Sequence, residues 1–209
     1  KRLVEQLLRL ARQDAPIGDR KEARFDICAV LREIVAELLA LAERRRIDIG
    51  LQARGTPLAF GHAYEIRSVL QNLIDNALRY APEGSAVDIV IEQSAETIDI
   101  RIVDEGPGIP DDQLQRVFDR FVRIEGSNVD GSGLGLAIAQ RAAERNRATL
   151  SLQNRRDRPG LIASVRLCRY IEPGTLLRAD ATPAVAASLP RIRELSASRQ
   201  VAEPEKMKI

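Results

Sequence analysis

Two asparagines and an arginine recur on one face of a helix that the sequence predicts over residues 61–80. Asn72, Asn76 and Arg79 follow one another at intervals of four and three residues, which brings them to one side of an α-helix. Amide oxygens can ligate a hard cation, amide nitrogens can donate to phosphate, and a guanidinium neutralises phosphate charge. A solvated polar face would show the same spacing, so this helix alone leaves both interpretations open.

A loop that begins with aspartate follows a strand predicted over residues 97–103. Asp104 can accept a hydrogen bond from an exocyclic amine, and Gly106 and Gly108 allow the backbone to approach a ligand closely. A tight turn also uses Asp, Gly and Pro. Taken alone, the loop therefore indicates either a binding site or an ordinary turn.

A second glycine-rich segment runs directly into a predicted helix over residues 133–146. Gly131, Gly133 and Gly135 are separated by single residues. Free N–H groups and the positive end of the helix dipole meet at such a junction, which favours binding of an anion. Simple capping of the helix by these residues is the alternative interpretation. No Gly-Lys-Ser/Thr follows, so this is not the P-loop of nucleoside triphosphatases, and the dinucleotide-binding fingerprint is not met either.

These segments lie within an alternation of helices and strands that favours a mixed α/β domain. The elements predicted elsewhere are a helix over residues 28–44, a short helix over 111–118, and strands over 47–51, 87–92, 149–153 and 161–167. A leading helix over residues 1–13 is apolar on a broad face and needs a helical partner. Residues 173–209 have the composition of a weakly ordered tail.

The composition argues against several classes of protein. Among 209 residues, 32 Lys and Arg nearly balance 30 Asp and Glu, and aromatic residues make up 3%, so we expect no nucleic-acid partner. Cys28, Cys168 and the single His62 form neither a disulfide framework nor a metal motif. No apolar stretch approaches the roughly 20 residues of a membrane span. We expect a cytoplasmic domain.

Together the segments resemble the ATP-binding catalytic domain of bacterial two-component sensor histidine kinases, over about residues 24–169. The N box of that family resembles residues 71–80, and its first glycine box resembles residues 104–110. Its F box resembles Phe118–Phe121, and its second glycine box resembles residues 131–138. The order and spacing of these four boxes make the resemblance specific.

The resemblance implies a two-layer α/β sandwich in which three helices cover one face of a mixed sheet, the fold of the GHKL superfamily. Residues 1–16 would be the end of a dimerisation helix and a linker. Residues 17–172 would be the ATP-binding catalytic domain, and residues 173–209 a flexible low-complexity tail. ATP would bind between the N-box helix and a mobile lid over about residues 111–132.

The resemblance also implies roles at the phosphate end of Mg-ATP. Asn76 would ligate Mg²⁺, while Asn72 and Arg79 would lie at the phosphates, and these three are the expected catalytic residues. The residues expected to close over the phosphates and the nucleotide are Gly133, Gly135 and Leu136.

At the other end of the nucleotide, Tyr80 would lie against the adenine and Asp104 would accept a hydrogen bond from its amino group. Gly106 and Gly108 would permit close approach of the backbone. The remaining residues expected to bind the nucleotide are Ile109, Phe118, Gly131 and Leu134.

The implied reaction is transfer of the γ-phosphoryl group of ATP to a histidine on a dimerisation helix. His62 lacks the acidic residue, the Arg and the Thr/Ser-Pro expected beside such an acceptor, so we interpret it as a helix cap or a surface residue. The acceptor would then lie before residue 1, and the chain would be a fragment without its own target. The whole kinase would be a homodimer anchored in the bacterial inner membrane, with a response-regulator receiver domain as partner.

Position 72 separates transfer from hydrolysis within the superfamily. Relatives such as DNA gyrase carry Glu there, four residues before the magnesium Asn, as a base for water. The Asn72 amide cannot accept a proton from water, whereas a neutral imidazole is already a nucleophile. The alternatives are a GHKL-type protein-serine kinase, which tends to carry Glu at this position, and a regulatory module that binds nucleotide without transfer.

Three further expectations concern neighbouring residues. Asn146 stands where the family usually has Gly, so we expect it to take the left-handed conformation that ends a helix. Asp111 and Asp112 are expected to complement the dipole at the start of the short helix. The arginines of residues 44–46 and 155–158 are expected to be solvated.

Overall fold

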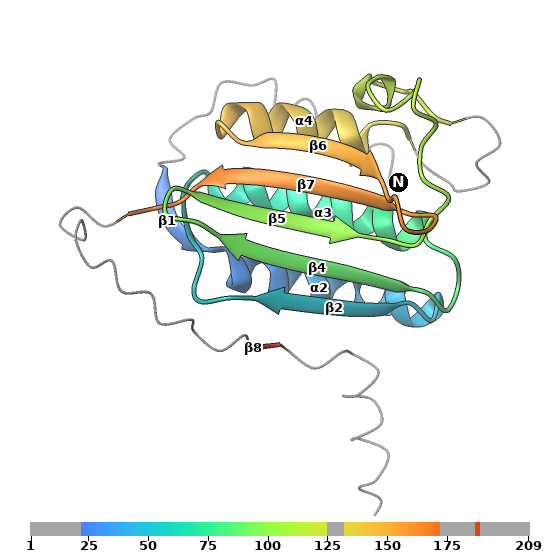
Figure 1. Cartoon of the computed structure of the whole chain (residues 1–209). Helices are drawn as coiled ribbons and strands as arrows, with labels where there is room; N and C mark the ends of the chain where they lie inside the picture. Colours follow the sequence, from blue (N-terminus) through green and yellow to red (C-terminus); the bar gives the residue numbers. More distant parts are fainter. Residues whose placement is uncertain (1–21, 125–131, 172–186, 189–209) are drawn as a thin grey trace, which may run out of the picture.

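The computed structural model describes residues 22–124, 132–171 and 187–188. In this part of the chain, three helices lie on one face of a six-stranded sheet (Figure 1). The helices are α2 (Ile27–Arg44), α3 (Ala63–Tyr80) and α4 (Gly135–Arg145). The strands are β2 (Asp48–Ala53), β4 (Ala86–Gln93), β5 (Thr97–Val103), β6 (Thr149–Asn154), β7 (Leu161–Cys168) and β8 (Ala187–Ser188).

The sheet has the order β6-β7-β5-β4-β2-β8. Strands β2 and β4 pair in parallel, and the other neighbours pair antiparallel, so the sheet is mixed. The predicted two-layer α/β sandwich, with its helices on one face of a mixed sheet, is confirmed.

The core lies between the sheet and the helices because the strands alternate in burial. In β5 the even-numbered isoleucines from Ile98 to Ile102 are buried, and in β4 so are Ile89 and Ile91, while the intervening side chains are partly exposed. The register pairs Ile89 with Ile102 and Ile91 with Ile100. This alternation is the pattern of a sheet that packs on one face only. Helix α3 covers this surface with apolar residues at helical spacing, namely Ile66, Leu70, Leu73, Ile74 and Ala77.

A separate two-stranded sheet joins β1 (Ala23–Asp26) and β3 (Leu58–Gly61) in antiparallel register. The sequence reading missed both strands, because four residues are too few to establish a period of two. Strand β1 leads directly into α2, whose first turn is capped by Asp26, which accepts from the N–H of Cys28 at 2.7 Å.

The short helix predicted over residues 111–118 is wrong. Residues 111–115 form turns, and the 3₁₀ turn η1 (Arg116–Phe118) follows them. Asp111 therefore complements no helix dipole, and its carboxylate instead accepts from the amide of Asn154 at 3.1 Å. A helix of one or two turns gains few hydrogen bonds for the residues that it orders, so a tertiary contact easily overrides it.

Polar contacts join the N-terminal end of α3 to the C-terminal end of α4, close to His62. His62 occupies the N-cap position of α3, but its side chain makes no capping hydrogen bond. Asn146 has φ −91° rather than the predicted left-handed conformation, which Arg147 takes at φ 55°. The Asn146 side chain instead accepts from the N–H of His62 at 2.8 Å and donates to Glu65 at 2.7 Å. Asn146 thus connects two helices, a role that a terminating Gly could not fill.

The leading helix predicted over residues 1–13 lies outside the described residues, as does the tail predicted over 173–209 apart from β8. In β8, Ala187 and Ser188 pair with Ala53 and Gln52 of β2. Among the helices that the structure describes, none has the length and apolar character needed to cross a membrane.

Candidate functional site

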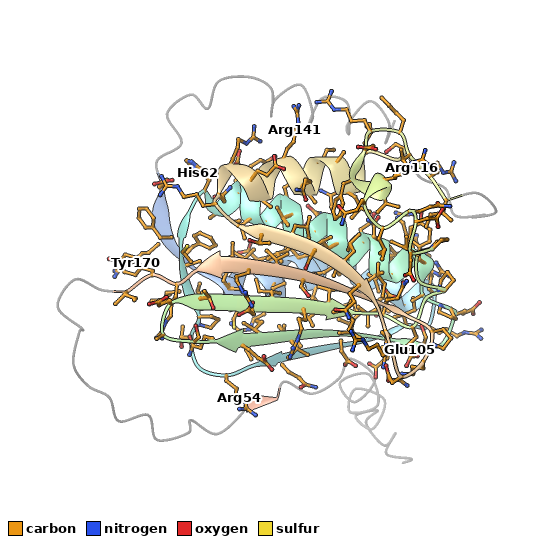
Figure 2. The ribbon with its side chains drawn as sticks, turned by 45° about the horizontal axis from the view of Figure 1, so that its top comes forward. Arg54, His62, Glu105, Arg116, Arg141 and Tyr170 are labelled. Carbon is orange, nitrogen blue, oxygen red and sulfur yellow. The ribbon has the colours of Figure 1, made fainter. Side chains whose placement is uncertain are left out.

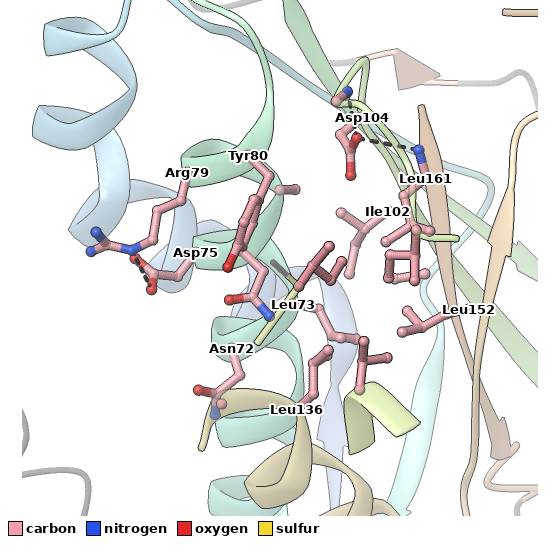
Figure 3. Close-up of a pocket in the computed structure, with 18 of the residues that line it drawn as sticks. Asn72, Leu73, Asp75, Arg79, Tyr80, Ile102, Asp104, Leu136, Leu152 and Leu161 are labelled. Atoms are coloured by element: carbon pink, nitrogen blue, oxygen red, sulfur yellow. Dashed lines mark hydrogen bonds and ion pairs between the residues drawn. The ribbon is translucent and has the colours of Figure 1, made fainter. Parts of the chain in front are cut away.

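A cavity lies between the C-terminal half of α3, the loop that follows β5, and the start of α4 (Figure 3). It encloses about 1130 Å³ of space not occupied by protein atoms, part of it open to solvent. The predicted residues that line it are Asn72, Asn76, Arg79, Tyr80, Asp104, Gly106, Gly108, Ile109, Gly133, Gly135 and Leu136. Residues from three distant segments of the sequence therefore meet at one place.

Two predicted residues do not line the cavity, and a third lies outside the described residues. Phe118 is partly buried against the main hydrophobic core, and Leu134 is fully buried with Ile138 in a second cluster. Neither side chain lines the cavity. Gly131 lies outside the described residues, as do residues 125–131 of the predicted lid.

The floor of the cavity is apolar, and the sequence analysis did not assign it. Its side chains come from α3, β5, β6 and β7, namely Leu73, Ile102, Leu152, Leu161 and Ala163. Period-two alternation identifies such strand residues as buried, but it does not indicate which of them face a cavity. An apolar floor with a few polar groups is typical of small-molecule sites.

Asp104 is the main polar group above this floor, and its side chain is 5% exposed. Its Oδ1 atom accepts from the N–H of Gly106 at 2.7 Å and from the N–H of Leu161 at 3.2 Å. Burial raises the pKa of Asp104, and the two backbone hydrogen bonds and Arg155 offset part of that increase. Its Oδ2 atom accepts no hydrogen bond from the described residues, and Figure 3 shows one carboxylate oxygen directed toward the cavity. A ligand N–H group could donate to it.

The polar face of α3 meets the start of α4 at the other end of the cavity. Asn72 donates from Nδ2 to the carbonyl of Ser68 at 2.8 Å. A side chain at position 135 would place its Cβ 3.3 Å from Oδ1 of Asn72 and 3.8 Å from Oδ1 of Asn76. Gly135 therefore keeps open the space on which the two amide oxygens converge.

This amide pair fits a hard cation only if the ligand supplies further oxygens. Among the described residues, no cluster of three His, Cys, Asp or Glu side chains could hold a metal ion. Mg²⁺ commonly takes one or two protein ligands and completes its shell with water and substrate phosphates. The donor set of Asn72 and Asn76 is compatible with that arrangement.

Arg79 is held by a partner that the sequence analysis missed. Its Nε atom lies 2.9 Å from Oδ2 of Asp75, an ion pair at i, i+4 spacing that could have been read from the sequence. Arg45 donates to the carbonyls of Arg79 and Ala81, the latter at 3.0 Å, and so satisfies the C-terminal end of α3. The expectation that residues 44–46 are solvated is therefore wrong for Arg45.

The turn between β6 and β7 supports the loop that begins at Asp104. Arg155 donates to the carbonyl of Asp104 at 3.4 Å and forms an ion pair of 2.7 Å with Asp157. Its side chain is 10% exposed, so the expectation of a solvated cluster at residues 155–158 is wrong for Arg155. Arg158, which is more exposed, forms an ion pair with Glu105 at 3.1 Å.

Comparison with known families agrees with this geometry. Residues 61–170 match the family described as histidine kinase-, DNA gyrase B-, and HSP90-like ATPase, and the chain belongs to that family. The matched region contains α3, the loop at Asp104 and the start of α4. The cavity is thus built from the part of the chain that defines the family.

Within the family, the chain is similar to sensor proteins. It is 34% identical to the sensor protein QseC of Salmonella typhi over 73% of this chain and 33% of that protein. It is 33% identical to the sensor protein kinase PmrB of Pseudomonas aeruginosa over 79% of this chain and 35% of that protein. The chain therefore spans about a third of the length of these curated relatives.

Solved structures support the same assignment. The mycobacterial sensor histidine kinase MprB aligns with a TM-score of 0.64 and 25% identity, over 71% of this chain and 98% of that one. The Acinetobacter baumannii histidine kinase AdeS also gives 0.64 and 25%, over 81% and 78% of the two chains. The resemblance to the ATP-binding catalytic domain of a sensor histidine kinase is confirmed.

Proposed function

We propose that the chain binds Mg-ATP in this cavity and transfers the γ-phosphoryl group to a histidine on the dimerisation helices of the same kinase. The observation that carries the proposal is the polarity of the cavity. Asp104 lies at one end beside an apolar floor, and Asn72 lies at the other end beside the start of α4 (Figure 3). A nucleotide has the same polarity, with a flat base at one end and anionic phosphates at the other.

At the base end, Oδ2 of Asp104 accepts a hydrogen bond from the exocyclic amino group of adenine. Its Oδ1 atom is occupied by two backbone N–H groups, which hold the carboxylate in one orientation. Ile102 and Leu161 exclude water beneath the base, and Tyr80 lies along its edge. Because a buried hydrogen bond has little competition from water, this contact discriminates strongly between bases.

At the phosphate end, Asn76 ligates Mg²⁺, and Asn72 and Arg79 lie at the phosphates. The ion would neutralise phosphate charge and orient the group to be transferred. The free N–H groups at the start of the eleven-residue α4 add partial positive charge on the same side. The ion pair with Asp75 restricts the rotamers of Arg79, which also lines the cavity.

Asn72 favours transfer over hydrolysis. Its amide is not a base, and its Nδ2 atom already donates to Ser68. The nearby carboxylate of Asp75 is paired with Arg79 and does not replace a base for water. A neutral imidazole needs no such base: its ring nitrogen forms a bond to the γ-phosphorus while the bond from that phosphorus to the β,γ-bridging oxygen breaks, and ADP leaves.

The proposal extends to partners and location. An aspartate of a response-regulator receiver domain would take the phosphoryl group from the histidine, and the kinase would act as a homodimer. The described domain would lie in the cytoplasm as part of a longer protein anchored in the bacterial inner membrane. Similarity to proteins described as a sensor protein and a sensor protein kinase supports a role in signalling.

The test supplies the chain with γ-labelled ATP and a purified dimerisation domain that bears the acceptor histidine. We expect label on the acceptor that acid removes and base does not, and we expect none with Asn76→Ala. Acid-stable label would indicate a serine kinase instead. Nucleotide binding without any label on the acceptor would indicate a regulatory module and contradict the proposal.

A further inference from the structure

The side chain of Asn154, the last residue of β6, makes three hydrogen bonds to the loop at the cavity wall. Its Oδ1 atom accepts from the N–H of Ile109 at 2.8 Å, and its Nδ2 atom donates to the carbonyl of Ile109 at 2.6 Å. The same nitrogen donates to Oδ1 of Asp111 at 3.1 Å. One amide therefore binds both polar groups of a single peptide residue, as a neighbouring strand would.

We propose that Asn154 is a positioning residue for nucleotide binding: it holds the backbone of residues 106–109 in the conformation that leaves Asp104 open to the base. This inference rests on the proposed function. Asn154 does not line the cavity, whereas Gly106, Gly108 and Ile109 do. It therefore acts on the ligand only through the loop.

Gly108 shows how tightly the two segments fit. It has φ 77°, and a Cβ at this position would lie 2.7 Å from Oδ1 of Asn154. Both the backbone conformation and the approach of Asn154 require glycine there. Gly108 thus lies against Asn154 while it also lines the cavity.

The loop has no helix or strand between Asp104 and Pro110, so side chains must fix its conformation. Asn154 binds its far end, and Arg155 contacts the carbonyl of Asp104 at its near end. Asp104 in turn orients its carboxylate through the N–H of Gly106. Displacement of Ile109 is thus transmitted along three residues to the group that would recognise the base.

The experiment replaces one amide with a carboxylate of the same shape. Asn154→Asp keeps an acceptor for the N–H of Ile109, removes both donated hydrogen bonds, and places negative charge against the Asp111 carboxylate. We expect affinities for ATP and ADP to fall by the same factor, about tenfold. In the nucleotide-free chain, we expect hydrogen exchange of the Ile109 amide to accelerate even though an acceptor is kept, because loss of the two donated hydrogen bonds and repulsion from Asp111 separate the two segments.

The matched control is Gln153→Glu, which makes the same chemical change on the adjacent residue. Gln153 is exposed, so we expect native affinity and native exchange at Ile109. Adding Asp111→Asn to Asn154→Asp should recover part of the affinity, because it removes the charge repulsion and restores a donor between the two positions. If Asn154→Asp does not fold, Asn154→Ala, which introduces no charge, replaces it in the same measurements.

Native ATP affinity in a folded Asn154→Asp chain would overturn the positioning role, as would accelerated exchange at Ile109 without any loss of affinity. Equal losses in Asn154→Asp and Gln153→Glu would also overturn it, because charge alone would then explain them. If the native chain binds no ATP, the proposed function itself fails. Titration of the native chain with ATP therefore distinguishes a failure of the positioning role from a failure of the proposed function.

Discussion

The polar groups that surround the two ends of helix α3 differ in what they bind. At its start, Glu65 is 8% exposed and accepts from Asn146, and it forms an ion pair with Arg145 at 3.0 Å. Near its end, buried Asp104 presents a carboxylate oxygen to a cavity. His62 and Glu105, which lie next to these two regions in the sequence, are at opposite ends of the molecule in Figure 2.

This difference distinguishes a structural polar cluster from a binding site. Buried polar groups are normally paired, and pairing within the protein fixes the relative position of the elements that carry them. At the start of α3, the pairs join α3 to α4. At its end, Oδ2 of Asp104 lies at a cavity and accepts no hydrogen bond from the described residues, so a carboxylate oxygen is available for recognition.

The largest expected effect comes from Asp104→Asn. The retained oxygen still accepts from Gly106 and Leu161, so the new NH₂ group faces the amino group of adenine. We expect ATP affinity to fall by about 100-fold, since a buried acceptor is exchanged for a donor. Calorimetric titration measures this loss, and Asp99→Asn on the exposed face of β5 is the control. Unchanged affinity would remove Asp104 from the base site.

Asn146→Ala, in contrast, is expected to lower stability and leave nucleotide affinity unchanged. It removes the hydrogen-bond partner of Oε2 of Glu65 and of the N–H of His62, which should lower the free energy of unfolding by about 2 kcal/mol. Nucleotide affinity should not change, because this cluster lies away from the cavity. Urea denaturation gives the first quantity, with Gln153→Ala as an exposed control. If the variant is fully folded and still binds ATP more weakly than the native chain, the two regions are not independent.

Asn76→Ala should separate the metal contribution from the rest of the site. We expect the strengthening of ATP binding by Mg²⁺ to decrease by about tenfold, because one ligand of the ion is removed. Binding of ATP without Mg²⁺ should remain near the native value. If Mg²⁺ strengthens binding to the variant and to the native chain equally, Asn76 does not ligate the ion.

The smallest expected effect is a pH dependence of stability. Burial raises the folded-state pKa of Asp104 above its ordinary value of 3.8, so folding favours the protonated form. The stability that this group contributes is present below pH 3.8 and is lost as the pH rises through the raised pKa. Relative to Asp104→Asn, the native chain should therefore lose stability over that interval. A native chain that instead gains stability relative to Asp104→Asn as the pH rises would contradict the sign of the shift.

The helices and strands that were predicted correctly carry apolar residues in a repeating pattern. Helix α3 and strands β4 and β5 carry apolar residues at periods set by their local geometry, so their faces can be read from spacing alone. The polar residues Asn72, Asn76 and Arg79 share a face of α3 by the same kind of spacing, whereas Asp104 was identified by its place after a strand and by the resemblance to the family's boxes. The cavity brings these residues together. Strands β1 and β3 were missed because their pairing depends on tertiary contacts.

The supporting residues could not be predicted for a related reason. Asn154 contacts Ile109 across 45 positions, and Asn146 contacts Glu65 across 81. A single polar residue at the end of a strand or helix has no local signature of such a partner. The Asp75–Arg79 pair is different, since its spacing was visible and only its consequence for Arg79 was overlooked.

The central claim is that this cavity binds the base of ATP at Asp104 and its phosphates beside Asn72 and Asn76. The most direct test is a calorimetric titration of the native chain with ATP and with GTP, each with and without Mg²⁺. GTP carries a carbonyl oxygen where ATP carries the amino group, so it presents an acceptor to the Asp104 carboxylate. We predict saturable ATP binding that Mg²⁺ strengthens, and GTP binding weaker by about 100-fold. Equal binding of the two nucleotides, or no ATP binding by a folded chain, would contradict the claim.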